Sequence, residues 1–204
     1  MRSPWSRAAT VYDWQLPLER VALRTMVAMM AISSSDSLLD VGTGTGAVLR
    51  EVKRTGVRPA GAIGVDVSDR MLSRARSLVP VGTELRHIDA RTLSLPDASV
   101  DVVTAAYLLH LLTAGVRAEL LREVHRVLVP GGRLGVVTMA PPRRKPTRLL
   151  SAPVRAAARR ASGLLAGLRP LDPADDLRTA GFEVDAVRRT ALGYPSVCVR
   201  ATRR

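Results

Sequence analysis

The 204 residues carry 31 Lys and Arg against 18 Asp and Glu, a formal net charge of +13, and 47% are apolar. This composition excludes a disordered chain and suffices for one domain with a sizeable core. Cys198 is the only cysteine, so no intrachain disulfide can form and a reducing cytoplasm is expected. The apolar stretch 16–32 is interrupted by Glu19, Arg20 and Arg24, which indicates a helix of a soluble protein instead of a membrane span.

From residue 38 onward, short β-branched runs alternate with helical stretches. This alternation predicts βαβ units and a parallel sheet. Pro130, Gly131 and Gly132 are expected to end a helix and turn the chain into the next strand. The connection 189–195 is too short for a helical crossover, so the last two strands should pair antiparallel. The expected strands are 38–41, 62–65, 84–88, 100–105, 133–138, 182–188 and 196–200, and the expected helices are 47–55, 69–78, 114–127 and 173–180.

The most informative motif spans residues 38–46, where an apolar run ends at Asp40 and glycines follow at positions 42, 44 and 46. Glycine reaches positive φ at little cost and lets a ligand approach the main chain, while the first amides of the following helix point outward. A strand, a tight turn and a helix start are therefore predicted around a nucleotide-like ligand. Gly42, Gly44 and Ala47 also meet the dinucleotide pattern, with Asp66 at a suitable distance.

Acidic residues at three successive strand ends favour a cationic nucleoside over a dinucleotide as the ligand. Asp40 precedes the glycine turn, Asp66 ends the second strand and Asp89 ends the third. A carboxylate at each of these ends would repel a pyrophosphate and attract a cationic sulfonium nucleoside.

With these residues in place, the sequence resembles the class I S-adenosylmethionine-dependent methyltransferases, in particular the small-molecule subgroup that includes quinone-biosynthesis C-methyltransferases. The resemblance implies an α/β, Rossmann-like, seven-stranded and mostly parallel sheet with an antiparallel C-terminal strand and helices on both faces. It also implies S-adenosyl-L-methionine as the cofactor and no metal. The resemblance runs through residues 38–46, 64–66, 88–90, 95–97, 99–103 and 128–132.

The same resemblance implies a role for each matching residue. The three glycines would pass under the methionine part of the cofactor, with Asp40 near its amino group. Asp66 would hold the ribose, Asp89 and the backbone of Ala90 the adenine, and Tyr107 would flank the methyl-transfer side together with Leu108. The expected cofactor-binding residues are Asp40, Gly42, Thr43, Gly44, Gly46, Asp66, Val67, Asp89, Ala90 and Tyr107.

Methyl transfer is an in-line displacement, so alignment and desolvation can supply much of the acceleration without an acid–base residue. His110 is the base candidate because imidazole titrates near neutrality and this segment faces the active-site mouth in the family; a packing or capping role is the alternative. Tyr12 is the second candidate, in an N-terminal aromatic segment that either covers the substrate or packs on the sheet. His87, within a strand, and His125, within a helix, are interpreted as structural.

The expected organisation is one domain over 1–204, with an N-terminal cap (1–35), a cofactor-binding core (36–140), a basic lid (141–172) and a C-terminal helix with a strand pair (173–204). Residues 141–170 carry eight basic side chains and no acid. Residues 143–169 could contact an anionic membrane, cover an acidic acceptor, or form an ordinary solvated face.

The leading hypothesis is methyl transfer to a small-molecule acceptor. An RNA methyltransferase is an alternative that the charge favours, although the fourth strand ends in Ala105, Ala106 and Tyr107 without a Pro-Pro-aromatic motif. A protein that binds the cofactor without catalysis and a nicotinamide-dependent reductase are further alternatives. The sequence specifies neither the acceptor nor the oligomeric state.

Overall fold

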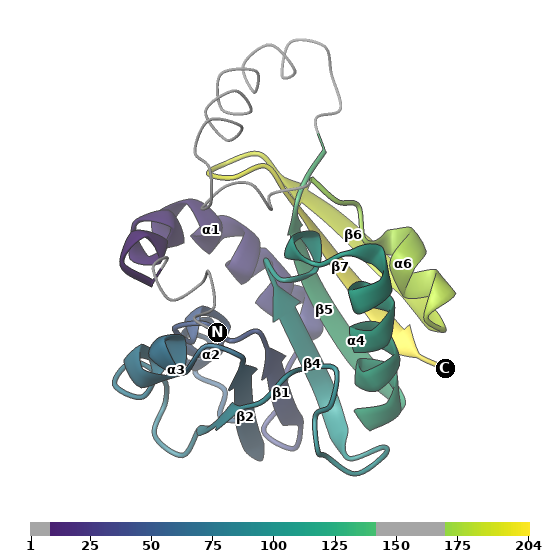
Figure 1. The fold of residues 1–204 in the computed structure, drawn as a ribbon, viewed down its shortest axis with the longest axis horizontal. Coiled ribbons are helices and arrows are strands. Elements are labelled where there is room, and N and C mark those ends of the chain that lie inside the picture. Colours follow the sequence, from purple (N-terminus) through teal and green to yellow (C-terminus); the bar gives the residue numbers. More distant parts are fainter. Residues whose placement is uncertain (1–8, 142–169) are drawn as a thin grey trace.

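The computed structural model describes residues 9–141 and 170–204, with side chains from residue 18 onward within those ranges. One sheet contains all seven strands in the order β3-β2-β1-β4-β5-β7-β6 (Figure 1). The neighbours from β3 to β5 pair in parallel, and β7 pairs antiparallel with both β5 and β6. The strands are β1 (Ser37–Val41), β2 (Gly61–Asp66), β3 (Glu84–His87), β4 (Val100–Ala106), β5 (Leu128–Met139), β6 (Phe182–Thr190) and β7 (Ser196–Arg203).

The expected α/β fold, with a mostly parallel sheet and a reversed C-terminal strand, is confirmed. The antiparallel pairing of the last two strands is also confirmed, and the pair forms one edge of the sheet. β7 lies between β5 and β6, which leaves β6 as the edge strand. Val197, Cys198 and Val199 are fully buried, as a strand covered on both faces requires, whereas β6 alternates between buried and exposed positions.

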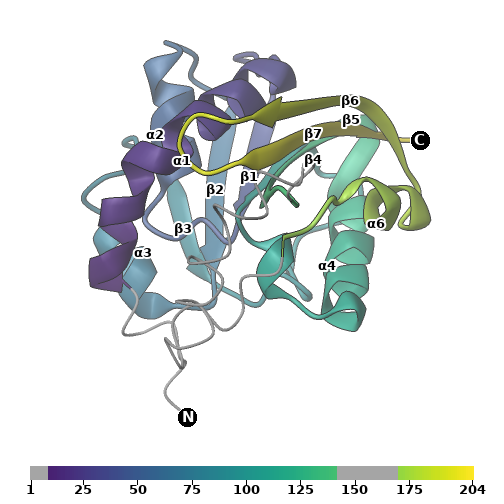
Figure 2. The same cartoon turned by 90° about the horizontal axis from the view of Figure 1, so that it is seen from above.

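Helices cover both faces of the sheet (Figure 2). On one face lie α1 (Ala9–Met30), α2 (Ala47–Arg54) and α3 (Asp69–Ala75), and on the other lie α4 (Ala114–Val127) and α6 (Ala174–Thr179). Each face has its own core. Met26 and Met30 of α1 pack with Leu38 and Val102 on the first side, while α4 packs on the alternate strand residues, such as Leu39, on the second. This alternation follows from the two-residue period of a strand.

Two boundaries differ most from the sequence prediction. β5 begins at Leu128, directly after α4, so the expected Pro-Gly-Gly turn lies inside the strand. The pairing with β4 jumps from Val100↔Leu128 to Val102↔Arg133, which means that the extra residues form an irregular bulge. α1 begins at Ala9, ahead of the expected stretch from residue 16. Among the described helices, none is both long and apolar enough to cross a bilayer.

The connection between β6 and β7 packs closely against α1, and the two lie beside each other in both views (Figures 1 and 2). Tyr194 N donates to Leu18 O at 3.1 Å. Gly193 has φ +79°, and a Cβ atom there would lie 2.0 Å from Leu18 O. This contact therefore needs glycine for both its backbone angle and its lack of a side chain.

We expect Gly193→Ala to lower the free energy of unfolding by about 3 kcal/mol, because a rigid backbone clash adds to the cost of positive φ. Gly82→Ala is the matched control, since Gly82 has φ +88° with no atom near a Cβ. The control should lose only about 1 kcal/mol. Chemical denaturation of both variants measures the difference, and equal losses would show that the α1 contact contributes nothing.

Candidate functional site

The sheet face beneath α1 becomes polar toward the carboxyl edge of the parallel strands. Leu38 of β1 and Val102 of β4 belong to the core under α1. Asp40 and Thr104 follow two residues later on the same strands, on the same face of the sheet, and they are register partners. Because β7 runs in the opposite direction, its first residue, Ser196, lies at the same edge. The strand order reverses between β1 and β4, which is where open α/β sheets bind their ligands.

Asp40 is a buried carboxylate that joins two strands and the glycine turn. Its side chain accepts hydrogen bonds from Thr43 Oγ1 and Thr104 Oγ1, each at 2.7 Å. Burial raises the pKa of Asp40 to about 6; the two hydroxyl donors oppose this shift, and the charge of Asp66 adds to it. The site therefore holds a carboxylate that a cationic ligand would stabilise.

Asp66, at the end of β2, ties the glycine turn to the neighbouring strand. Its carboxylate accepts from Gly44 N at 2.9 Å and from Ser68 N at 2.8 Å. Thr43 N donates to Val65 O at 2.9 Å, which adds a second tie. Burial raises the pKa of Asp66, although the backbone donors act in the opposite direction. The structure thus brings the first two predicted acids together around the turn.

The turn ends at Gly46, the residue that caps α2. Gly46 has φ 80°, and a Cβ atom there would lie 2.2 Å from Val79 Cγ1. A larger residue would therefore displace the turn. Next to it, Thr45 Oγ1 is buried without a hydrogen-bond partner among the described residues. An unpaired hydroxyl beside unpaired helix amides fits a polar ligand over the turn.

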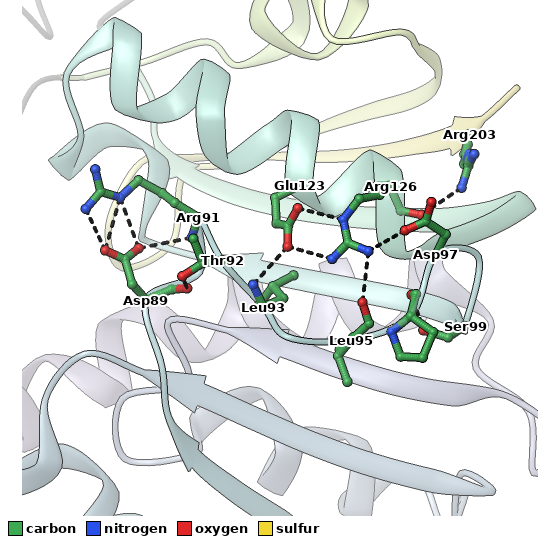
Figure 3. A network of polar contacts seen from close by, with 11 residues as sticks. Asp89, Arg91, Thr92, Leu93, Leu95, Asp97, Ser99, Glu123, Arg126 and Arg203 are labelled. Carbon is green, nitrogen blue, oxygen red and sulfur yellow. Dashed lines mark hydrogen bonds and ion pairs between the residues drawn. The ribbon is translucent and has the colours of Figure 1, made fainter.

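The third predicted acid is placed differently. Asp89 follows β3 and is partly exposed, and its carboxylate is paired with Arg91 at 2.6 Å and with Arg91 N at 3.0 Å (Figure 3). The Arg91 guanidinium lowers the pKa of Asp89. A ligand amino group would have to share this carboxylate with Arg91. Ala90, beside it, is buried.

The segment after Asp89 is fixed to α4 by an ion-pair network (Figure 3). Glu123 accepts from Leu93 N at 2.9 Å and pairs with Arg126 at 2.7 Å. Arg126 also donates to Leu95 O at 2.8 Å and pairs with Asp97. These contacts use both backbone and side chains, and they fix residues 93–97, which follow Ala90, to α4.

Tyr107 immediately follows β4 with φ 55°, an unusual conformation for a bulky residue. Its hydroxyl lies 2.9 Å from Ser196 Oγ. Because the Ser196 hydroxyl donates its own hydrogen to Tyr194 O at 2.8 Å, the Tyr107 hydroxyl is the donor to Ser196. The next residue, Leu108, lies over the glycine turn: a Cβ atom on Gly42 would be 3.0 Å from its side chain. The residues that follow the fourth strand therefore lie beside the glycine turn, as the sequence predicted.

His110 lies close behind Tyr107, with the two rings in an edge contact at 6.1 Å. It is buried, and its Nδ1 has no partner among the described residues. Burial lowers the pKa of His110 to about 4, which makes it neutral and a weak base at pH 7. His125, interpreted as structural, packs edge-on against Phe182 at 5.2 Å.

The remaining predicted residues lie at the margin of the site or outside the described part. Val67 follows Asp66 and is half exposed, and its carbonyl oxygen is 2.8 Å from His87 Nε2. Tyr12 belongs to α1, but its side chain is outside the described residues, as is the basic segment 143–169.

Sequence reasoning missed several polar residues at this edge. Thr104, which holds Asp40, stood inside an expected strand, and Ser196 was the first residue of another. Glu19 of α1 was interpreted as a break in an apolar stretch, yet it is only 4% exposed. Its spacing of three and four residues from Ala22 and Leu23, both buried, was the available signal, because that spacing shares one helix face.

Parts of this sequence and its fold are similar to known proteins. Residues 38–132 match the model of a methyltransferase domain family. A demethylmenaquinone methyltransferase of Tropheryma whipplei (strain Twist) is 35% identical over 122 residues, which cover 59% of this chain and 49% of that protein. A malonyl-[acyl-carrier protein] O-methyltransferase of Marinomonas sp. is 29% identical over 138 residues, 67% of this chain and 50% of that protein. The chain thus spans about half the length of these curated relatives.

A solved S-adenosylmethionine-dependent methyltransferase from Mesorhizobium loti shares 25% identity and a TM-score of 0.67, covering 91% of this chain and 98% of that one. The seven-stranded, mostly parallel sheet with its antiparallel C-terminal strands agrees with this structural match. Residues 38–132 therefore match a methyltransferase domain, and the chain resembles the quinone methyltransferases and a solved S-adenosylmethionine-dependent methyltransferase.

Proposed function

We propose that this chain transfers a methyl group from S-adenosyl-L-methionine to a small-molecule acceptor. The observation that carries the proposal is a pair of carboxylates on either side of one glycine turn, the buried Asp40 and the partly buried Asp66. Two such groups disfavour a pyrophosphate and favour a ligand that carries positive charge. The names of relatives, demethylmenaquinone methyltransferases among them, support a small acceptor, for which a quinone is one model.

Different residues of the site would bind different parts of the cofactor. We assign Asp66 to the ribose, Asp40 and the three glycines to the methionine part, and the backbone of Ala90 to the adenine. When bound, the cofactor supplies a methyl group activated by its positive sulfur. Leu108 and Tyr107 then close the space above the turn, which excludes water and limits the approach of the acceptor.

A reducing compartment is part of this proposal. Cys198 is fully buried, and its thiol donates to Ala22 O at 3.4 Å. Burial raises the pKa of Cys198 to about 11, so the thiol stays protonated at neutral pH. The fold therefore does not depend on an oxidised cysteine, which agrees with a reducing compartment such as the cytoplasm.

Removal of the ribose-binding acid tests the function. Asp66→Ala should weaken the binding of S-adenosylmethionine at least tenfold, since a charge-assisted hydrogen bond contributes more than about 1.4 kcal/mol. Asp69→Ala, which removes an exposed acid three residues later, should leave affinity unchanged. Isothermal calorimetry measures both, with thermal melts to verify folding. A folded wild-type chain that does not bind S-adenosylmethionine would refute the proposed function.

The raised pKa of Asp40 predicts a pH dependence of cofactor binding. A cation stabilises the ionised carboxylate, so binding should release protons and affinity should rise with pH up to about 6, then level off. Calorimetry in two buffers with different ionisation enthalpies counts the protons. An affinity that falls as pH rises from 5 to 7 would contradict the role given to Asp40.

A further inference from the structure

A buried glutamate on α1 is not used by the cofactor site described above. Glu19 is 4% exposed and shares a helix face with Ala22, Leu23 and Met26, which pack on the sheet in one core cluster with Tyr107. The apolar stripe of α1 thus ends in an acid. It does so at the carboxyl edge, where the strands below end in polar residues as well.

Two tyrosines from other parts of the fold lie in the neighbourhood of Glu19. Tyr107 follows β4, and Tyr194 precedes β7 and is joined to the neighbouring turn of α1 through Leu18 O. The Glu19 carboxylate contributes to raising the pKa of both phenols, after the larger effect of burial. Glu19 therefore lies in one cluster with the residue that precedes Leu108, the side chain over the glycine turn.

The described residues provide no hydrogen bond and no ion pair for the Glu19 carboxylate. The nearby Tyr107 hydroxyl gives its hydrogen to Ser196 instead. Glu51, the other buried glutamate facing α1, differs in this respect, because Arg24 and Arg54 pair with it at 3.1 and 2.7 Å. Toward the described residues, Glu19 thus keeps its acceptor capacity unused at the carboxyl edge of the sheet.

The burial of Glu19 costs stability. It raises the pKa of Glu19 from 4.5 to about 7. Since the folded pKa is the higher one, the folded state binds more protons between these values, and stability falls as pH rises from 4.5 to 7. A residue that weakens the fold at neutral pH and has no partner among the described residues is a candidate for contact with a ligand.

We propose that Glu19 binds the hydroxyl group of a phenol-type methyl acceptor and takes its proton. This inference rests on the proposed methyl transfer and names the acceptor class for it. In the proton-transfer step the acceptor O–H bond breaks, its electron pair stays on the acceptor oxygen, and a new O–H bond forms on the Glu19 carboxylate. The rings of Tyr107 and Tyr194 suit an aromatic acceptor.

Glu19 is a better base than the predicted His110. A general base works best when its pKa lies near the operating pH. Glu19, with a pKa of about 7, meets this condition, whereas His110, at about 4, does not. Tyr107, Tyr194 and Cys198 all have raised pKa values, so among these groups and Glu19 only Glu19 is expected to titrate between pH 5.5 and 8. Asp40 of the cofactor site, with a pKa of about 6, also titrates in this range.

The test uses 2-naphthol as a probe phenol with the full chain and S-adenosylhomocysteine present, measured by calorimetry. The affinity of the wild-type chain should rise about tenfold from pH 5.5 to 8, as Glu19 becomes able to accept. Glu19→Gln should bind at least tenfold more weakly at pH 8 and show no pH dependence. Its thermal midpoint at pH 8 should equal or exceed that of the wild type, because a buried charge is removed.

Glu51→Gln is the matched control: it should lose thermal stability through its broken ion pairs but keep the affinity for 2-naphthol. Equal binding of 2-naphthol to the wild type and Glu19→Gln, or no binding to either, would overturn the proposal, as would preferential binding of benzylamine at Glu19. The affinity for S-adenosylmethionine distinguishes a failure of the acceptor assignment from a failure of the proposed function. If Glu19→Gln binds S-adenosylmethionine normally in either case, only the acceptor assignment fails.

Discussion

The rest of the site depends on a buried carboxylate at the end of the first strand. Asp40 lies where β1 and β4 part, and the hydroxyls of Thr43 and Thr104 are its two internal donors. Burial of this charge is unfavourable, and two neutral hydrogen bonds offset only part of the cost. The carboxylate nevertheless fixes the glycine turn to both strands. A cationic ligand would supply the missing compensation, which links the architecture to the choice of cofactor.

The same transition from apolar to polar recurs on three elements that reach this edge. On β1 it runs from Leu38 to Asp40, on β4 from Val102 to Thr104, and on α1 from Met26 back to Glu19. The core beneath α1 therefore opens into a polar end without a change of fold. The proposed cofactor residues lie at the ends of β1 and β2 and the proposed acceptor residue lies on α1, so the two substrates would contact different elements.

The sequence allowed the sheet, its reversed strand and the glycine turn to be predicted, because local periodicity and turn chemistry specify them. The place of β7 between β5 and β6 could not be read locally, since it depends on long-range pairing. The bulge around Gly131 was mistaken for a turn because both use the same residues. The burial of Glu19 was missed because an acid in an apolar stretch usually faces solvent, and tertiary packing decides otherwise.

The central claim is that the carboxylates around the turn select a sulfonium nucleoside over a dinucleotide. Equilibrium binding of S-adenosylmethionine and of NADH to the same wild-type preparation tests it most directly. The account predicts saturable binding of S-adenosylmethionine that an excess of NADH does not displace. Tight binding of NADH, with no binding of S-adenosylmethionine to the folded chain, would contradict it.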